Sequence, residues 1–168
     1  VIRRFVVTID NMPGKKLPQR HIINKSAEGR FLTAGEEGAQ YINADNYERY
    51  TPYIRLLESL DTQKIAALYI RFYPLFQAAY VDLGYPSAYF NDRLIEVIDH
   101  LLATPDVQGR IKLVRPHVLY KFASPELEAL SAGQKILVRI GHSNAVRVKS
   151  KLRELRQALT VQEPAPAP

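Results

Sequence analysis

The chain of 168 residues contains no cysteine, no tryptophan and a single methionine. Without cysteine the fold cannot depend on disulfides, and thiolate zinc sites, iron–sulfur clusters and cysteine nucleophiles are excluded together. A protein without cysteine can be located in an oxidising compartment as well as in the cytosol, so the composition does not decide between the two. The most apolar stretch, residues 65–83, is interrupted by Arg71, Pro74, Gln77 and Asp82. It therefore lacks the run of about 20 apolar residues that crosses a bilayer.

Motifs of the common enzyme classes are also missing. The sequence has no Gly-x-Ser-x-Gly, no phosphate-binding loop, no dinucleotide fingerprint and no His-Glu-x-x-His. His21, His117 and His142 are isolated from one another in expected loops or extended segments. The sequence therefore indicates no reaction and favours a non-catalytic protein over an enzyme.

Length and composition favour one compact domain of ordinary size. The chain is 46% hydrophobic, which suits a domain that buries about 70% of the surface of its unfolded chain. We expect a mainly α, bundle-like domain with a small β element over residues 1–159, followed by a disordered Pro/Ala-rich tail over 160–168. The chain begins with Val1, so we expect that the natural amino terminus, with any signal or anchor, has been removed.

The hydrophobic periodicity predicts the elements of this domain. Helices are expected over 2–12, over 45–60 with Asp45 as cap, over 61–83 with a cap at Asp61 and a break at Pro74, over 91–103, after Ser124–Pro125, over 134–140, and over 143–159 with Ser143 as cap. Residues 13–29 are expected to form a long loop, 31–33 a short strand, and the segments on the two sides of Pro116 two more.

Positive charge is concentrated in the last third of the chain. Residues 1–105 hold 12 Lys or Arg and 12 Asp or Glu, whereas residues 106–168 hold 11 and 5. The net charge of +6 therefore belongs to this last part. Its candidate anion-binding residues lie on the expected last helix: Arg147, Lys149, Lys151, Arg153 and Arg156. A merely solvated helix surface explains the same pattern.

Nine of the ten tyrosines lie between Tyr41 and Phe90. Tyr69, Phe72, Phe76 and Tyr80 keep helical spacing and are expected in the core. The candidate binding tyrosines, which could form the rim of a groove for a sugar or a peptide, lie near expected helix starts and turns: Tyr47, Tyr50, Tyr53, Tyr85 and Tyr89.

The one candidate for chemistry is the series Asp92, Glu96 and His100, spaced four residues apart on one helix. This spacing brings carboxylates and an imidazole side by side, as metal ligands or an acid–base pair require. An ordinary polar helix surface gives the same pattern. We therefore assign no catalytic residue, no metal site and no cofactor, and keep this series as the alternative.

Four strings carry a family resemblance: RFVVTIDNMP near the start, IRFYPLFQAAYVDLGYP and FNDRLIEVIDHLLATP in the middle, and ELEALSAGQKILVRIG near the end. In this order they resemble a family of uncharacterised proteobacterial proteins that is described as a domain of unknown function. The resemblance covers Val1 to about Leu159. It implies an envelope protein with an amino-terminal membrane helix and a Pro-rich linker before this domain.

These observations together predict a non-catalytic interaction module that is tethered to the inner membrane and faces the periplasm. The expected partner is another envelope protein or an anionic surface, and the oligomeric state stays open. The alternative is an envelope hydrolase or metal-dependent enzyme that uses Asp92, Glu96 and His100. Nucleic-acid binding through the basic last helix conflicts with the implied compartment.

Overall fold

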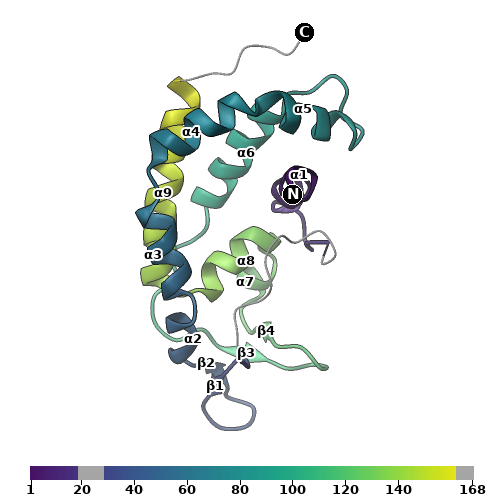
Figure 1. Cartoon of the computed structure of the whole chain (residues 1–168). Coiled ribbons are helices and arrows are strands. Elements are labelled where there is room, and N and C mark those ends of the chain that lie inside the picture. The colour runs from purple at the N-terminus through teal and green to yellow at the C-terminus, as the bar shows by residue number, and fades with distance from the viewer. Residues whose placement is uncertain (19–28, 162–168) are drawn as a thin grey trace.

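Figure 1 shows the computed structural model of the chain, of which residues 1–18 and 29–161 are described here. Helices dominate, and the strands form two small antiparallel sheets. The expected mainly α fold with short β elements is confirmed. In chain order the elements are α1 (Ile2–Asn11), β1 (Thr33–Ala34), β2 (Tyr41–Ile42), α2 (Asp45–Glu48), α3 (Thr51–Ser59), α4 (Thr62–Arg71), α5 (Tyr73–Val81), α6 (Phe90–Leu102), β3 (Leu113–Val114), β4 (Lys121–Phe122), α7 (Pro125–Glu128), α8 (Ala132–Arg139) and α9 (His142–Val161).

The longest helix, α9, holds the helical part together. It runs beside α3 and α4 along one edge of the molecule and also contacts α6 and α8 (Figure 1). On the other side, α1 packs against α5 and α6. The main core lies between these helices, and its fully buried residues are Val6 of α1, Ala66 of α4 and Phe90 at the start of α6.

The regular spacing of α6 explains its central place. Leu94, Val97, Ile98 and Leu101 recur at intervals of three and four residues, so all four lie on one side of the helix and are buried. The expected helix over 91–103 is confirmed.

The aromatic block forms much of this core. The Phe90 ring stacks on Phe76 at 6.1 Å, and Tyr69 and Tyr80 are buried beside them. Phe72 does not join them, although its spacing predicts a core position, because 40% of it is exposed. It lies between two helices with φ −101° and ψ 8°, so the helical periodicity that places Tyr69 inside does not continue through it.

Two prolines divide what would otherwise be longer helices. Pro74 lies in the first turn of α5, and α4 ends before it at Arg71, as expected from the missing proline N–H. Pro52 does the same at the start of α3. The single helix expected over 45–60 is therefore wrong: the structure has α2 and α3 instead.

The helix caps agree only in part with expectation. Asp61 accepts hydrogen bonds from the Gln63 and Lys64 amides and caps α4, as predicted. Asp45 is not a cap, because it lies inside α2, and the Asn43 side chain accepts from the Asp45 amide instead. Ser143 is not a cap either, because α9 begins one residue earlier at His142.

The strands form one small β region below the helices (Figure 1). Leu113 pairs with Phe122 in the β3–β4 hairpin, and the Ile42 amide donates to Ile111 O at 3.0 Å, which joins the two sheets. The short strand expected over 31–33 lies slightly later, at Thr33–Ala34. Of the expected loop and tail, residues 19–28 and 162–168 lie outside the described part of the chain.

Candidate functional site

The five candidate tyrosines belong to two separate regions. Tyr47 and Tyr50 are partly buried at α2 and just before α3, and Tyr53 is exposed on α3. Tyr85 and Tyr89 are exposed in the turn between α5 and α6. The helices α2 and α5 lie at opposite ends of the α3–α4–α5 series (Figure 1), so the structure does not bring these tyrosines around one groove.

The Tyr47 ring has a packing role that spacing alone does not reveal. A Cβ atom at Gly141 would lie only 2.6 Å from the Tyr47 ring, and Gly141 has φ +88°. Both facts require glycine at this position, because a Cβ atom would clash with the ring and because residues with a side chain rarely adopt a positive φ. The ring thus packs against the turn that leads from α8 into α9.

The two lysines of the expected basic helix are buried. Lys149 is 5% exposed, and its Nζ donates to Thr104 O and, at 2.8 Å, to Asp106 Oδ1. Lys151 Nζ donates to Leu60 O at 3.1 Å and also bonds Thr62 and Glu154. These ammonium groups stabilise the fold at the carboxyl ends of α6 and α3.

The arginines of α9 are exposed or partly exposed, and two of the three are paired. Arg147 binds Glu58 on α3 at 2.5 Å, and Arg156 binds Asp99 on α6 at 2.5 Å. Hydrogen bonds from these guanidinium groups lower the pKa values of both carboxyl groups. Arg153 is exposed and makes no ion pair with a described residue. Whether α9 binds an anionic partner stays a prediction.

The side chains of Asp92, Glu96 and His100 have different surroundings. Asp92 is exposed, whereas Glu96 pairs with Arg93 at 2.9 Å. Arg93 also binds Asp10 of α1 at 2.8 Å. Among the described residues, no group of three His, Asp or Glu side chains is placed to hold a metal ion.

His100 instead contacts a serine that the sequence did not single out. Its Nε2 lies 2.8 Å from Ser131 Oγ, a pairing that resembles a nucleophile and its base. Ser131 is buried, however, and caps α8 by accepting from the Gln134 amide, while Gln134 Oε1 accepts from the Ser131 amide. The Ser-x-x-Gln pattern of residues 131–134 is typical of a capping box and could have predicted this role of Ser131 from the sequence. The pair is explained by its structural role.

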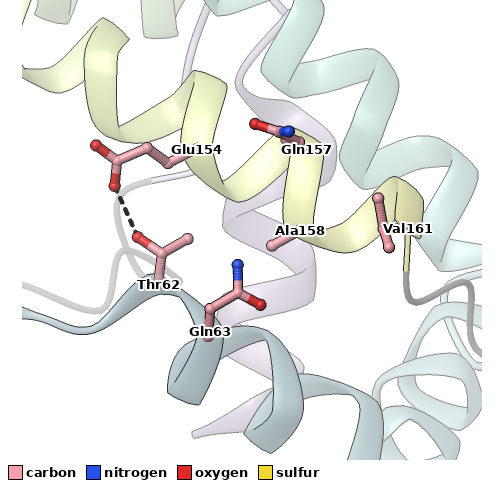
Figure 2. Close-up of a pocket in the computed structure, with 6 residues that line it drawn as sticks. All are labelled: Thr62, Gln63, Glu154, Gln157, Ala158 and Val161. Carbon is pink, nitrogen blue, oxygen red and sulfur yellow. Dashed lines mark hydrogen bonds between the residues drawn. The ribbon is translucent and has the colours of Figure 1, made fainter.

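A pocket of about 400 Å³ lies between the start of α4 and the end of α9 (Figure 2). Its lining is Thr62, Gln63, Glu154, Gln157, Ala158 and Val161. The one charged side chain, Glu154, already accepts hydrogen bonds from Thr62 at 2.8 Å and from Lys151 at 2.9 Å. The carboxylate of this lining is thus already engaged in hydrogen bonds within the protein.

The β3–β4 hairpin carries cations that are not neutralised. Residues 107–124 contain four cations and no Asp or Glu. All four are exposed, and none pairs with a carboxylate of the described chain: Arg110, Lys112, Arg115 and Lys121. Arg110 and Arg115 instead lie over the rings of Tyr41 and Tyr120, at 4.7 and 5.3 Å from the ring centroids. Sequence reasoning missed this segment because its charge was counted together with α9.

The hairpin also carries an apolar tip. Val118 and Leu119 are adjacent in the loop after β3, and each is 77% exposed. The loop extends away from the body of the molecule (Figure 1), and Arg115 Nε donates to Val118 O at 3.2 Å within it. Leu113 and Phe122 point into the core, whereas Val114 and Lys121 pair on the opposite, exposed surface. The alternation of a β-hairpin thus keeps the cations outside.

Comparisons with known proteins relate the chain to a protein family. No curated protein and no solved structure matches the chain. No helix among the described residues is both long enough and apolar enough to span a membrane. A family described as protein of unknown function (DUF3014) matches residues 1–156. The chain therefore belongs to the DUF3014 family.

Proposed function

We propose that this domain is a non-catalytic interaction module of the bacterial cell envelope, and that the β3–β4 hairpin contacts an anionic membrane surface. The domain would be tethered to the inner membrane and face the periplasm, in keeping with the envelope proteins that the sequence resembles. The observation that carries the proposal is the hairpin, which combines exposed unpaired cations with an exposed apolar tip.

The cations of the hairpin are better suited to binding a lipid surface than to stabilising the fold. Each Lys or Arg near an anionic leaflet contributes about 1 kcal/mol to binding. The four hairpin cations lose no intramolecular ion pair when they bind, because they make none with described carboxylates. The cations of α9 differ, since four of the five are already paired.

The apolar tip adds a second, weaker contribution. Full burial of a valine or leucine side chain contributes about 1.5–3 kcal/mol. Val118 and Leu119 together therefore support reversible insertion into the interface but no stable anchoring. A tether would raise the local concentration of the hairpin at the membrane, which makes such a weak contact effective.

Vesicle flotation tests this proposal. We expect the domain to float with vesicles of phosphatidylcholine and phosphatidylglycerol, not with phosphatidylcholine alone, and to dissociate as salt is added. Replacing Lys112, Arg115 and Lys121 together by Gln should reduce the affinity on the order of a hundredfold, from about 1 kcal/mol for each cation. Val118→Ser with Leu119→Ser should weaken binding without changing its salt dependence.

The matched control removes the same number of exposed cations elsewhere, by Arg55→Gln, Lys64→Gln and Arg153→Gln on α3, α4 and α9. This variant should bind like the original chain, and circular dichroism should show that every variant is folded. Equal loss of binding in the control and the hairpin variant would refute a hairpin-specific contact. Unchanged binding of the hairpin variant would refute it as well.

A further inference from the structure

The outward surface of α4 and α5 is unusually apolar. Helix α5 contains no charged residue from Tyr73 to Val81. Its buried side, with Tyr73, Gln77 and Tyr80, packs on the core, but its other side is apolar too. A helix that is apolar on all sides is normally covered by protein or lipid on every side.

The exposed residues of this surface follow one another along the two helices. Leu68, Phe72, Leu75 and Val81 are 57%, 40%, 51% and 38% exposed, and Ala78 is exposed among them. On α5, Leu75, Ala78 and Val81 follow one another at three-residue intervals, as residues on one side of a packing helix do, and Leu68 and Phe72 continue the exposed apolar set across the break between α4 and α5. No described residue of the chain covers them. We call this set, with Arg71 and Asp82 at its ends, the α4–α5 surface.

The order of residues on the α4–α5 surface is self-complementary. Around a point between Phe76 and Gln77, Leu75 mirrors Ala78, Phe72 mirrors Val81, and Arg71 mirrors Asp82. In an antiparallel pair of identical helices related by a twofold axis, each residue faces its mirror residue on the other copy. A large side chain would then face a small one in the centre, and a cation would face an anion at each end.

We propose that the α4–α5 surface is covered by a second copy of this chain in an antiparallel, twofold-symmetric dimer. The charges at its ends support this occupant. Arg71 and Asp82 are both exposed, and neither forms an ion pair with a described residue. Two Arg71–Asp82 pairs between the copies would fix the antiparallel direction and the register.

The dimer is expected to be reversible. Stable interfaces bury about 1,200 Å² or more in total, and a contact between short helices lies at the small end of this range. The dimer is independent of the membrane contact proposed above, because the hairpin residues are not part of it. Vesicle binding can therefore fail while dimerisation succeeds, and the reverse.

Charge exchange tests both the partner and the geometry. In Arg71→Glu, both ends of the dimer hold two anions, and in Asp82→Arg both hold two cations, so sedimentation should show each variant as a monomer. An equimolar mixture of the two should form dimers again. In such a dimer the introduced glutamate of one copy faces the introduced arginine of the other, and the unchanged Asp82 faces the unchanged Arg71. The double variant R71E/D82R should dimerise with itself but not with the original chain.

Arg55→Glu serves as the control, since it changes the net charge equally at an exposed position of α3. It should dimerise like the original chain, and Leu75→Glu should not dimerise. The inference is overturned if the original chain stays monomeric up to its solubility limit. It is overturned equally if the mixture of single variants is no more dimeric than each alone, or if Leu75→Glu has no effect.

Discussion

At the scale of single residues, the lysines of α9 show how a charge pattern can conceal a structural role. Lys149 and Lys151 look like parts of a basic surface in the sequence, but each extends its alkyl chain inward and bonds a backbone carbonyl at the end of another helix. Such carbonyls have no partner within their own helix and need one from elsewhere. The side chains therefore act as helix C-caps supplied from a distance.

Lys149→Met should lower the free energy of unfolding by about 1–3 kcal/mol, because the aliphatic stem is kept while Thr104 O loses its hydrogen bond. Urea denaturation followed by circular dichroism measures this loss. Arg153→Met, on the exposed side of the same helix, should change stability by no more than about 0.5 kcal/mol. Similar values for the two variants would contradict the capping role of Lys149.

At the scale of elements, the connection between α5 and α6 depends on one buried amide. No side chain of its own caps α6 at its N-cap residue Tyr89. Gln77 of α5 supplies this function, since its Oε1 accepts from the Phe90 amide at 2.8 Å and from the Tyr73 hydroxyl, while its Nε2 donates to Ala88 O at 2.8 Å. Helix α5 thus fixes both the turn before α6 and the first residue of α6.

Gln77→Met should therefore loosen the start of α6 and lower the free energy of unfolding by about 2–4 kcal/mol, since more than one buried polar group loses its partner. Hydrogen exchange should increase first at the Phe90 amide. Gln157→Met on the exposed surface of α9 is the control and should leave both quantities nearly unchanged. Retained protection of the Phe90 amide in Gln77→Met would argue against this account.

Expectations for the elements succeeded where a local signal is strong. The periodicity of α6, the break at Pro74 and the Asp61 cap each depend on residues within a few positions of one another. Expectations failed where a helix breaks or where neighbouring residues could fill the same role. Phe72 turns outward at a helix break, the Asn43 side chain accepts from the amide of Asp45, which was itself the expected cap, and Ser131 caps α8, for which no cap was expected.

For the candidate anion-binding residues, too, the sequence predicts some properties and not others. The excess of positive charge in the last third of the chain could be counted from the sequence. Which cations remain unpaired could not, because Glu58 and Asp99, the partners of Arg147 and Arg156, lie far away along the chain. The folded structure shows that most cations of α9 are paired and that the unpaired cations are concentrated in the β3–β4 hairpin.

At the scale of the whole molecule, the titratable groups define a range of pH in which the fold is most stable. Burial raises the pKa values of Tyr69, Tyr73 and Tyr80 above their ordinary value of 10.0. At the acid end, a hydrogen bond from Lys149 lowers the pKa of Asp106 below 3.8, as the α9 arginines do for Glu58 and Asp99.

We expect stability to decrease at both ends of this range. A raised tyrosine pKa contributes stability that is complete below the unfolded pKa of 10.0 and is lost as the pH rises through the folded pKa. A lowered carboxyl pKa contributes stability that is lost as the pH falls from the unfolded value through the folded one. Urea midpoints measured against pH should therefore fall above pH 10 and below about pH 4.

The alkaline side has a direct spectroscopic check. Absorbance of phenolate at 295 nm should rise in two stages, first from the exposed tyrosines and then, together with unfolding, from the buried ones. A single gradual titration of all tyrosines in the folded protein would contradict the burial of Tyr69.

The way in which α9 closes the fold also has a consequence for biosynthesis. Thr104 O and Leu60 O receive their partners from Lys149 and Lys151, which the ribosome adds long after α6 and α3. A growing chain that lacks α9 leaves these carbonyls, and the core surface of α4 and α6, without partners. The domain therefore completes its fold only when its last helix has emerged, and until then the nascent chain stays open to chaperones.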